Sequence, residues 1–169
     1  MRLSRLIFCM LSAAVALGAT ALAGAARAPS ADGTLSVRDA KAAIQLRLRG
    51  AVIGRLAQGQ LTITDPVEDT ATVVVRGAER QRDVNERTTV YTGTDIRFRI
   101  VDEERFNLRL NAKGINFSAV GRGDVWLDGR GDPDDGIYFD GAYSLNGSPF
   151  RSIPDERTRF DLETPPPAP

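Results

Sequence analysis

The feature that most constrains this chain is an alternation of apolar and polar residues that recurs from about residue 35 onward. The clearest runs are Ile44–Arg49, Ile96–Ile100 and Phe106–Asn111, in which every second residue is apolar. A period of two places the apolar residues on one face of an extended chain, so each run predicts a half-buried β-strand. Only Asp39–Ala43 is compatible with a helix, and we expect no helix longer than two turns.

Turn signals separate these runs. Asp-Pro begins at residue 65, Asp-Gly at 128, 135 and 140, and Asn-Gly at 146, and such dipeptides favour tight turns. Further strands are expected at 51–56, 60–64, 71–76, 88–92, 115–120, 124–128, 136–140, 142–145 and 159–162. Residues 77–86 are expected to form a charged, exposed loop. The predicted fold is therefore all-β, a single-domain antiparallel β-sandwich or barrel of about ten short strands.

The first residues have the order of a secretory signal peptide. Arg2 and Arg5 precede an uncharged stretch, residues 6–26, that ends mostly in Ala and Gly. This is the pattern that signal peptidase cleaves, and we place the signal peptide at residues 1–25. The alternative is an uncleaved anchor, because the stretch approaches the roughly 20 residues that span a bilayer. We expect a protein that is secreted or held at the cell envelope and that does not span the membrane after cleavage.

The rest of the chain is expected to be one all-β domain, residues 34–163, followed by a Pro-rich extended tail, residues 164–169. The whole chain has 22 basic and 22 acidic residues, so its net charge indicates neither nucleic acid nor an anionic membrane as a partner. Cys9 is the only cysteine and there is no histidine. The predicted mature domain therefore excludes disulfides, thiol chemistry, imidazole bases and the usual zinc sites.

An acidic loop at residues 128–136 is the candidate metal site. Its carboxylates are the oxygen ligands that a hard cation such as calcium prefers, and they come from Asp128, Asp132, Asp134 and Asp135. Their spacing lacks the regular alternation of a calcium loop, and Arg130 occupies a position where a ligand would help. We therefore favour a hairpin loop in which Asp and Gly serve turn geometry. Calcium is the one cofactor that the sequence suggests.

Two sets of residues on polar strand faces are candidates for ligand binding. Trp126 is out of phase with Val125 and Leu127, so its indole is expected on the outer face, where it could stack on a sugar ring or be partly covered. The second set is a stripe of arginines, which would suit an acidic glycan or a teichoic-type polymer. It consists of Arg47, Arg49, Arg97, Arg99 and Arg109. The alternative is a solvated face with Asp and Glu interleaved.

Two other classes of function stay open. A carbohydrate-active or other hydrolase would need paired carboxylates, drawn from Asp124, Asp128 and Asp140, with Tyr138 nearby. Their spacing does not fix a carboxylate separation, and Asp in hairpin turns is normally structural. The third class is assembly through a sheet edge, because many strands without disulfides leave edges that must be paired or protected.

The stretch 115–129, followed by 141–147 and 152–160, resembles secreted all-β proteins of high-GC Gram-positive, actinobacterial-type bacteria that carry no assigned activity. The resemblance implies a β-fold outside the membrane and transfers no catalytic residue. We therefore expect an exported, non-catalytic β-domain that acts as a binding or structural module at the cell envelope or outside the cell. Its expected partner is an envelope glycan or another protein.

Overall fold

The computed structural model describes residues 31–65, 70–130 and 140–164. These residues form an antiparallel sheet and contain no helix, so the predicted all-β class is confirmed. Consequently, no helix in the described ranges could cross a membrane. The strands are β1 (Ala31–Thr64), β2 (Thr72–Arg76), β3 (Arg80–Asn85), β4 (Thr88–Gly129), β5 (Ala142–Leu145), β6 (Arg151–Ser152) and β7 (Thr158–Thr164).

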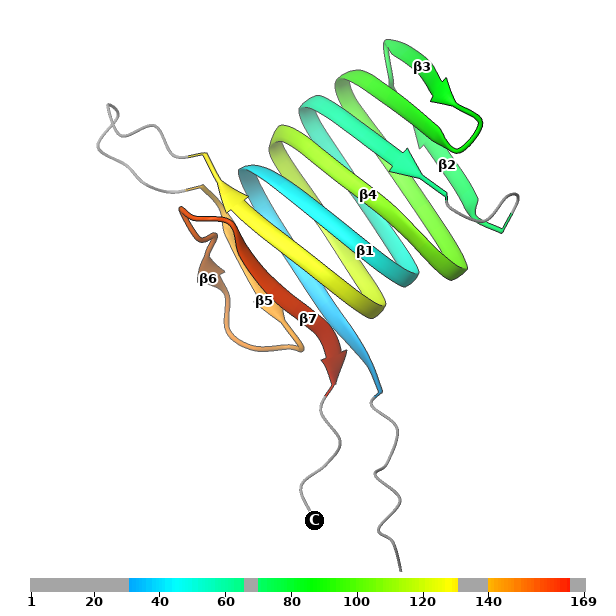
Figure 1. The fold of residues 1–169 in the computed structure, drawn as a ribbon. Coiled ribbons are helices and arrows are strands. Elements are labelled where there is room, and N and C mark those ends of the chain that lie inside the picture. Colours follow the sequence, from blue (N-terminus) through cyan, green and yellow to red (C-terminus); the bar gives the residue numbers. More distant parts are fainter. Residues whose placement is uncertain (1–30, 66–69, 131–139, 165–169) are drawn as a thin grey trace, which may run out of the picture.

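The two long strands, β1 and β4, wind together as a flattened coil (Figure 1). Over much of its length each strand has the other as its partner on both sides. Ile44 of β1 pairs with Leu110 and Leu127 of β4, and Leu110 in turn pairs with Ile44 and Leu61. Ile44 and Leu61 are seventeen residues apart, so the chain takes about that many residues to go once around the coil.

The coil has two broad faces, and the described residues contribute seven paired segments to each. The Trp126 face consists, in order of pairing, of 80–85, 88–92, 60–64, 107–111, 43–48, 124–128 and 158–162. The opposite Arg97 face consists of 72–76, 97–101, 51–55, 116–120, 33–37, 142–145 and 151–152. At one end of the coil lie β2 and β3, and at the other lie β5, β6 and β7 (Figure 1).

The alternation of inward and outward residues changes phase where the strands round one edge of the coil. In β1 the buried residues have odd numbers up to Val37 and even numbers from Ala40 onward. Asp39, between them, has a left-handed φ of 48°. The same change occurs around Asp95 (φ 52°) and Gly114 (φ 62°) in β4. Each left-handed residue acts as a bulge that inserts one extra residue. The strand therefore bends without turning its apolar residues outward.

One apolar cluster from both faces fills the interior of the coil. It is made mainly of Leu, Ile and Phe side chains that are almost completely buried, such as Leu46, Ile100 and Phe106. Burying one such side chain stabilises a fold by about 1.5–3 kcal/mol. Since Cys9 is the only cysteine, no intrachain disulfide contributes, and this burial is the main stabilising term.

Several sequence expectations need correction. A sandwich or barrel of about ten short strands is not confirmed, because the predicted strands 44–49, 51–56 and 60–64 are consecutive parts of β1. The predicted loop 77–86 contains β3, and Asp39–Ala43 is extended rather than helical. The predicted signal peptide and most of strand 136–140 lie outside the described residues, as does the tail after Thr164.

We expect Gly123→Ala to lower the free energy of unfolding by at least about 2 kcal/mol. Gly123 has a φ of 151°, and a Cβ there would overlap the carbonyl oxygen of Arg47. Gly147→Ala is the matched control, because Gly147 has a φ of 73° but nothing lies within 4 Å of a Cβ; it should cost about 1 kcal/mol, the penalty of a left-handed φ alone. Denaturant unfolding followed by circular dichroism measures both, and equal losses would contradict the close-approach argument.

We expect stability above pH 10 to depend on Tyr91, whose pKa is raised by burial and then by the negative charge of Asp83. A raised pKa means that the folded state holds the phenol proton more tightly than the unfolded state. Its stabilisation is complete below the ordinary tyrosine pKa of about 10 and is lost as pH rises through the raised value. The Tyr91→Phe variant should therefore lose less free energy of unfolding than the parent as the pH rises above about 10, as measured by denaturant unfolding at a series of alkaline pH values. If the variant and the parent lose the same free energy of unfolding at high pH, Tyr91 does not determine the alkaline stability.

Candidate functional site

The structure brings three of the predicted ligand-binding residues together on the Trp126 face. Trp126 pairs with Gln45, and Gln45 pairs with Arg109 on its other side. Arg47 lies two residues beyond Gln45 on β1, so it shares the same outer side. As the alternation predicts, Val125 and Leu127 are completely buried while Trp126 is half-buried on the outer side.

These residues line a depression of about 400 Å³, which we call the Trp126 hollow. Its wall comes from three segments of the coil and from the residues just before β7. The lining residues are Ala43, Ile44, Gln45, Arg47, Arg109, Leu110, Asn111, Trp126, Asp128 and Arg157. The hollow therefore combines one aromatic ring, amide groups, guanidinium groups and one carboxylate.

Two guanidinium groups frame the indole of Trp126. The Cζ atom of Arg47 lies 5.2 Å from the ring centroid and that of Arg157 lies 5.8 Å from it, within the range of a cation–π contact. Arg157 also donates a hydrogen bond from Nη2 to Oε1 of Gln45 at 2.8 Å. Sequence reasoning missed Arg157, because only the pairing of β7 with β4 brings it near Trp126.

The hollow carries an excess of positive charge. Arg47, Arg109 and Arg157 form no ion pair with any described residue, and Asp128 is the one carboxylate among the described residues of the lining. The nearest further carboxylate along β4, Asp124, is already bound by Arg159.

Arg159 neutralises the acidic residues beside the hollow. It donates hydrogen bonds from Nε and Nη2 to Oδ1 of Asp124, at 3.1 and 2.5 Å, and from Nη2 to Oδ1 of Asp161 at 3.1 Å. The hydrogen bond and charge of Asp124 raise the pKa of Arg159, with a smaller contribution from Asp161. Among the described residues, Asp128 is therefore the one carboxylate left to compete for the arginines of the hollow.

The predicted arginine stripe is divided between opposite surfaces. Arg97 lies on the other face, where it and Arg55 both pair with Asp95, at 3.0 and 3.1 Å. Arg99 lies on that face between Val74 and Ile53. One continuous stripe through all five arginines is therefore wrong, because the coil carries residues 47 and 97 to opposite sides.

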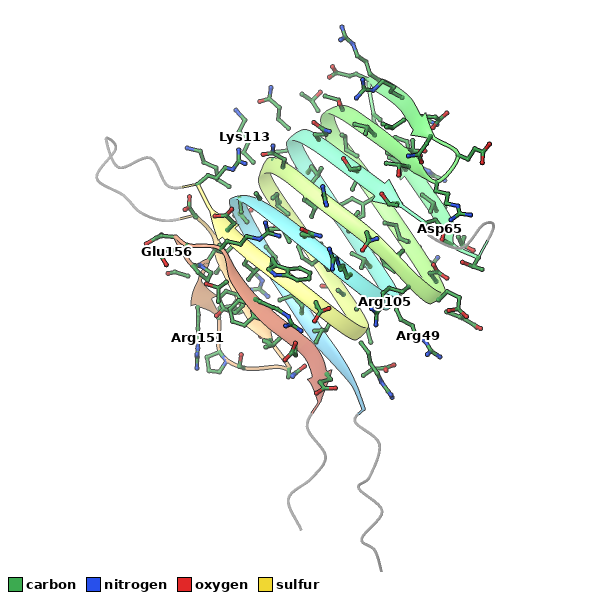
Figure 2. All side chains as sticks on the ribbon, viewed as in Figure 1. Arg49, Asp65, Arg105, Lys113, Arg151 and Glu156 are labelled. Atoms are coloured by element: carbon green, nitrogen blue, oxygen red, sulfur yellow. The ribbon has the colours of Figure 1, made fainter. Side chains whose placement is uncertain are left out.

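Arg49 projects from an edge of the coil together with Arg105, while Lys113 lies at the opposite edge (Figure 2). Arg49 and Arg105 line a second depression of about 500 Å³, which also contains Arg122, Glu104, Asp124, Asp161 and Glu163. Its charges are mixed, and Arg122 is paired with Asp32 at 2.9 Å. This edge has no excess of positive charge comparable to that of the Trp126 hollow.

The carboxylates proposed for hydrolysis do not converge. Asp124 is bound to Arg159 on the outer face, whereas Asp140 is only 1% exposed, lies beside Gly129 and has an Oδ2 atom without a hydrogen bond to the described residues. Asp128 alone lines the hollow. Tyr138 lies outside the described residues.

Of the candidate calcium ligands, Asp128 lies in the Trp126 hollow, whereas Asp132, Asp134 and Asp135 lie outside the described residues. Within the described ranges, no group of three or more Asp, Glu, His or Cys residues is arranged to hold a metal ion. The calcium hypothesis therefore rests on the sequence pattern alone.

No protein-family model, curated protein or solved structure gives a significant match to this chain.

We expect Arg157→Ala to expose the indole of Trp126, because it removes one of the two guanidinium groups that frame the ring. Trp126 is the only tryptophan, so the intrinsic indole fluorescence reports on this position alone. Emission should shift to longer wavelength and acrylamide quenching should rise. Arg151→Ala, on exposed β6, is the matched control and should leave both unchanged. Unaltered emission and quenching in the Arg157 variant would contradict the contact.

Proposed function

We propose that this protein is an exported, non-catalytic binding module of the cell envelope or extracellular space, and that its ligand is an acidic glycan bound in the Trp126 hollow. The observation that carries the proposal is the framing of Trp126 by arginines that lack ion-pair partners among the described residues. A guanidinium without an ion-pair partner is a ready donor for a carboxylate or sulfate.

The lining of the hollow suits each part of an acidic sugar. Arg47, Arg109 and Arg157 would bind the anionic group of the sugar beside Trp126. The apolar side of the sugar ring would pack on the indole. Gln45 and Asn111 offer amide donors and acceptors for hydroxyl groups. The volume of about 400 Å³ lies within the range of small-ligand sites.

The N-terminal sequence supports export. Its basic start, apolar middle and small-residue end have the order of a signal peptide. The resemblance of residues 115–129, 141–147 and 152–160 to secreted all-β proteins of actinobacterial type points the same way. Export would place the hollow where envelope glycans are available.

A hydrolase is the alternative, and the positions of the carboxylates favour binding over catalysis. Hydrolysis of a glycoside requires two carboxyl groups close to one sugar ring. Asp128 lies in the hollow, but Asp124 is held by Arg159 and Asp140 is buried. A ligand in the hollow would therefore meet one carboxylate from the described residues.

The test is a titration of Trp126 fluorescence with an oligosaccharide of galacturonic acid, compared with a neutral oligosaccharide of equal length. We expect a saturable change with the acidic ligand that weakens at high salt, because ion pairs at an open site are screened. Arg47→Gln and Arg109→Gln should each weaken binding by roughly tenfold, which corresponds to about 1.4 kcal/mol.

Arg97→Gln and Arg99→Gln are the matched controls, since both remove an exposed arginine from the opposite face. Equal losses from both pairs of variants would contradict a site in the hollow, and equal binding of the neutral oligosaccharide would contradict recognition of the anionic group. Release of reducing ends that stops on Asp128→Asn would instead support the hydrolase. A calcium-dependent rise in the unfolding temperature would support the metal hypothesis.

A further inference from the structure

We infer that two copies of this chain associate through strand β2, edge to edge, around a two-fold axis. Strand β2 is the last strand of the Arg97 face at one end of the coil (Figure 1). Within the described residues it pairs only with β4. Its outer edge therefore offers main-chain donors and acceptors to another strand.

The direction of the strands selects the symmetry. In the described parts of the chain, seven segments follow one another across each face, and every neighbouring pair is antiparallel. The first and last segments therefore run in the same direction, so copies stacked head to tail would meet in parallel. A two-fold axis instead places β2 antiparallel to its own copy, which continues the alternation. Antiparallel pairing is slightly more stable per residue, and two-fold dimers are the commonest oligomers.

The side chains of β2 suit this pairing. Val73 and Val75 pair with Ile100 and Phe98 and so lie on the inner side of the sheet, yet Val73 is still 36% exposed. A pairing centred on Val74 would set Val73 opposite Val75 of the second copy and extend the apolar interior across the junction. It would also set Thr72 opposite Arg76 of the second copy, so no like charges would meet directly.

Strand β2 lacks the features that protect an edge strand from pairing, such as charged residues, proline or short length, whereas the other end strands have at least one of them. Its first four residues are Thr-Val-Val-Val, without charge or proline. Strand β3 carries Arg80, Arg82 and Asp83, and β7 carries alternating charges. Strand β6 has only two residues. Charges and short length are the usual protection against edge pairing, so among the described strands β2 is the edge left for self-association.

The test is sedimentation velocity of the full chain over a concentration series. We expect a monomer–dimer equilibrium, and Val74→Lys should raise its dissociation constant by roughly tenfold or more, because two lysines would face each other at the axis. Ile53→Lys is the matched control, since Ile53 lies two strands inward on the same face and is 61% exposed, against 41% for Val74. It should leave the equilibrium unchanged.

A cysteine pair tests the axis directly. With Cys9 replaced by Ser, Val74→Cys should give a disulfide-linked dimer on mild oxidation, because residues directly opposite in a sheet are close enough to bridge. Val84→Cys, which is 54% exposed on β3, should not. A wild-type chain that is monomeric throughout, or equal cross-linking at both positions, would overturn the proposal. So would a dimer insensitive to Val74→Lys while circular dichroism shows that variant folded.

Discussion

The pairing of β1 with β4 on both sides is the constraint on which the rest of the fold depends. A single hairpin of two long strands would leave both outer edges unpaired and one apolar side exposed to water. Winding it into a coil pairs each turn with the next and places all the inward residues in a common interior. Backbone hydrogen bonding and apolar burial are thereby satisfied together, without a disulfide and with few separate strands.

The alternation of the sequence predicted the β-class and the orientation of many side chains, but not the continuity of the strands. An extra residue at Asp39 or Gly114 shifts the alternation by one, which resembles the end of a strand when read along the sequence alone. Strand β3 was missed because its residues are all exposed and its pattern is that of a charged loop. The sequence feature that could have predicted the coil is a spacing of seventeen residues between apolar residues of successive turns. Ile44 and Leu61 have this spacing, and so do Leu110 and Leu127.

The candidate site shows the same limit. Trp126 could be placed on an outer surface from its phase relative to Val125. The grouping of arginines could not, because strand order decides that Arg109 joins Trp126 while Arg97 lies on the opposite face. Arg157 belongs to no alternating run, and its role depends on the path of the chain into β7. Side-chain direction is thus a local property, whereas the membership of a site is set by long-range pairing.

The two proposed surfaces are separated on the coil, and that separation has a consequence for a polymeric ligand. The hollow spans the fourth to the sixth of the seven described segments of its face, counted from the end that carries β2 and β3, and Trp126 lies on the sixth. With strands about 4.8 Å apart, a two-fold junction at β2 would put two hollows roughly 50 Å apart. A ligand too short to span that distance would gain nothing from dimerisation. A glycan chain that reaches both hollows would bind with avidity, because its second contact becomes intramolecular.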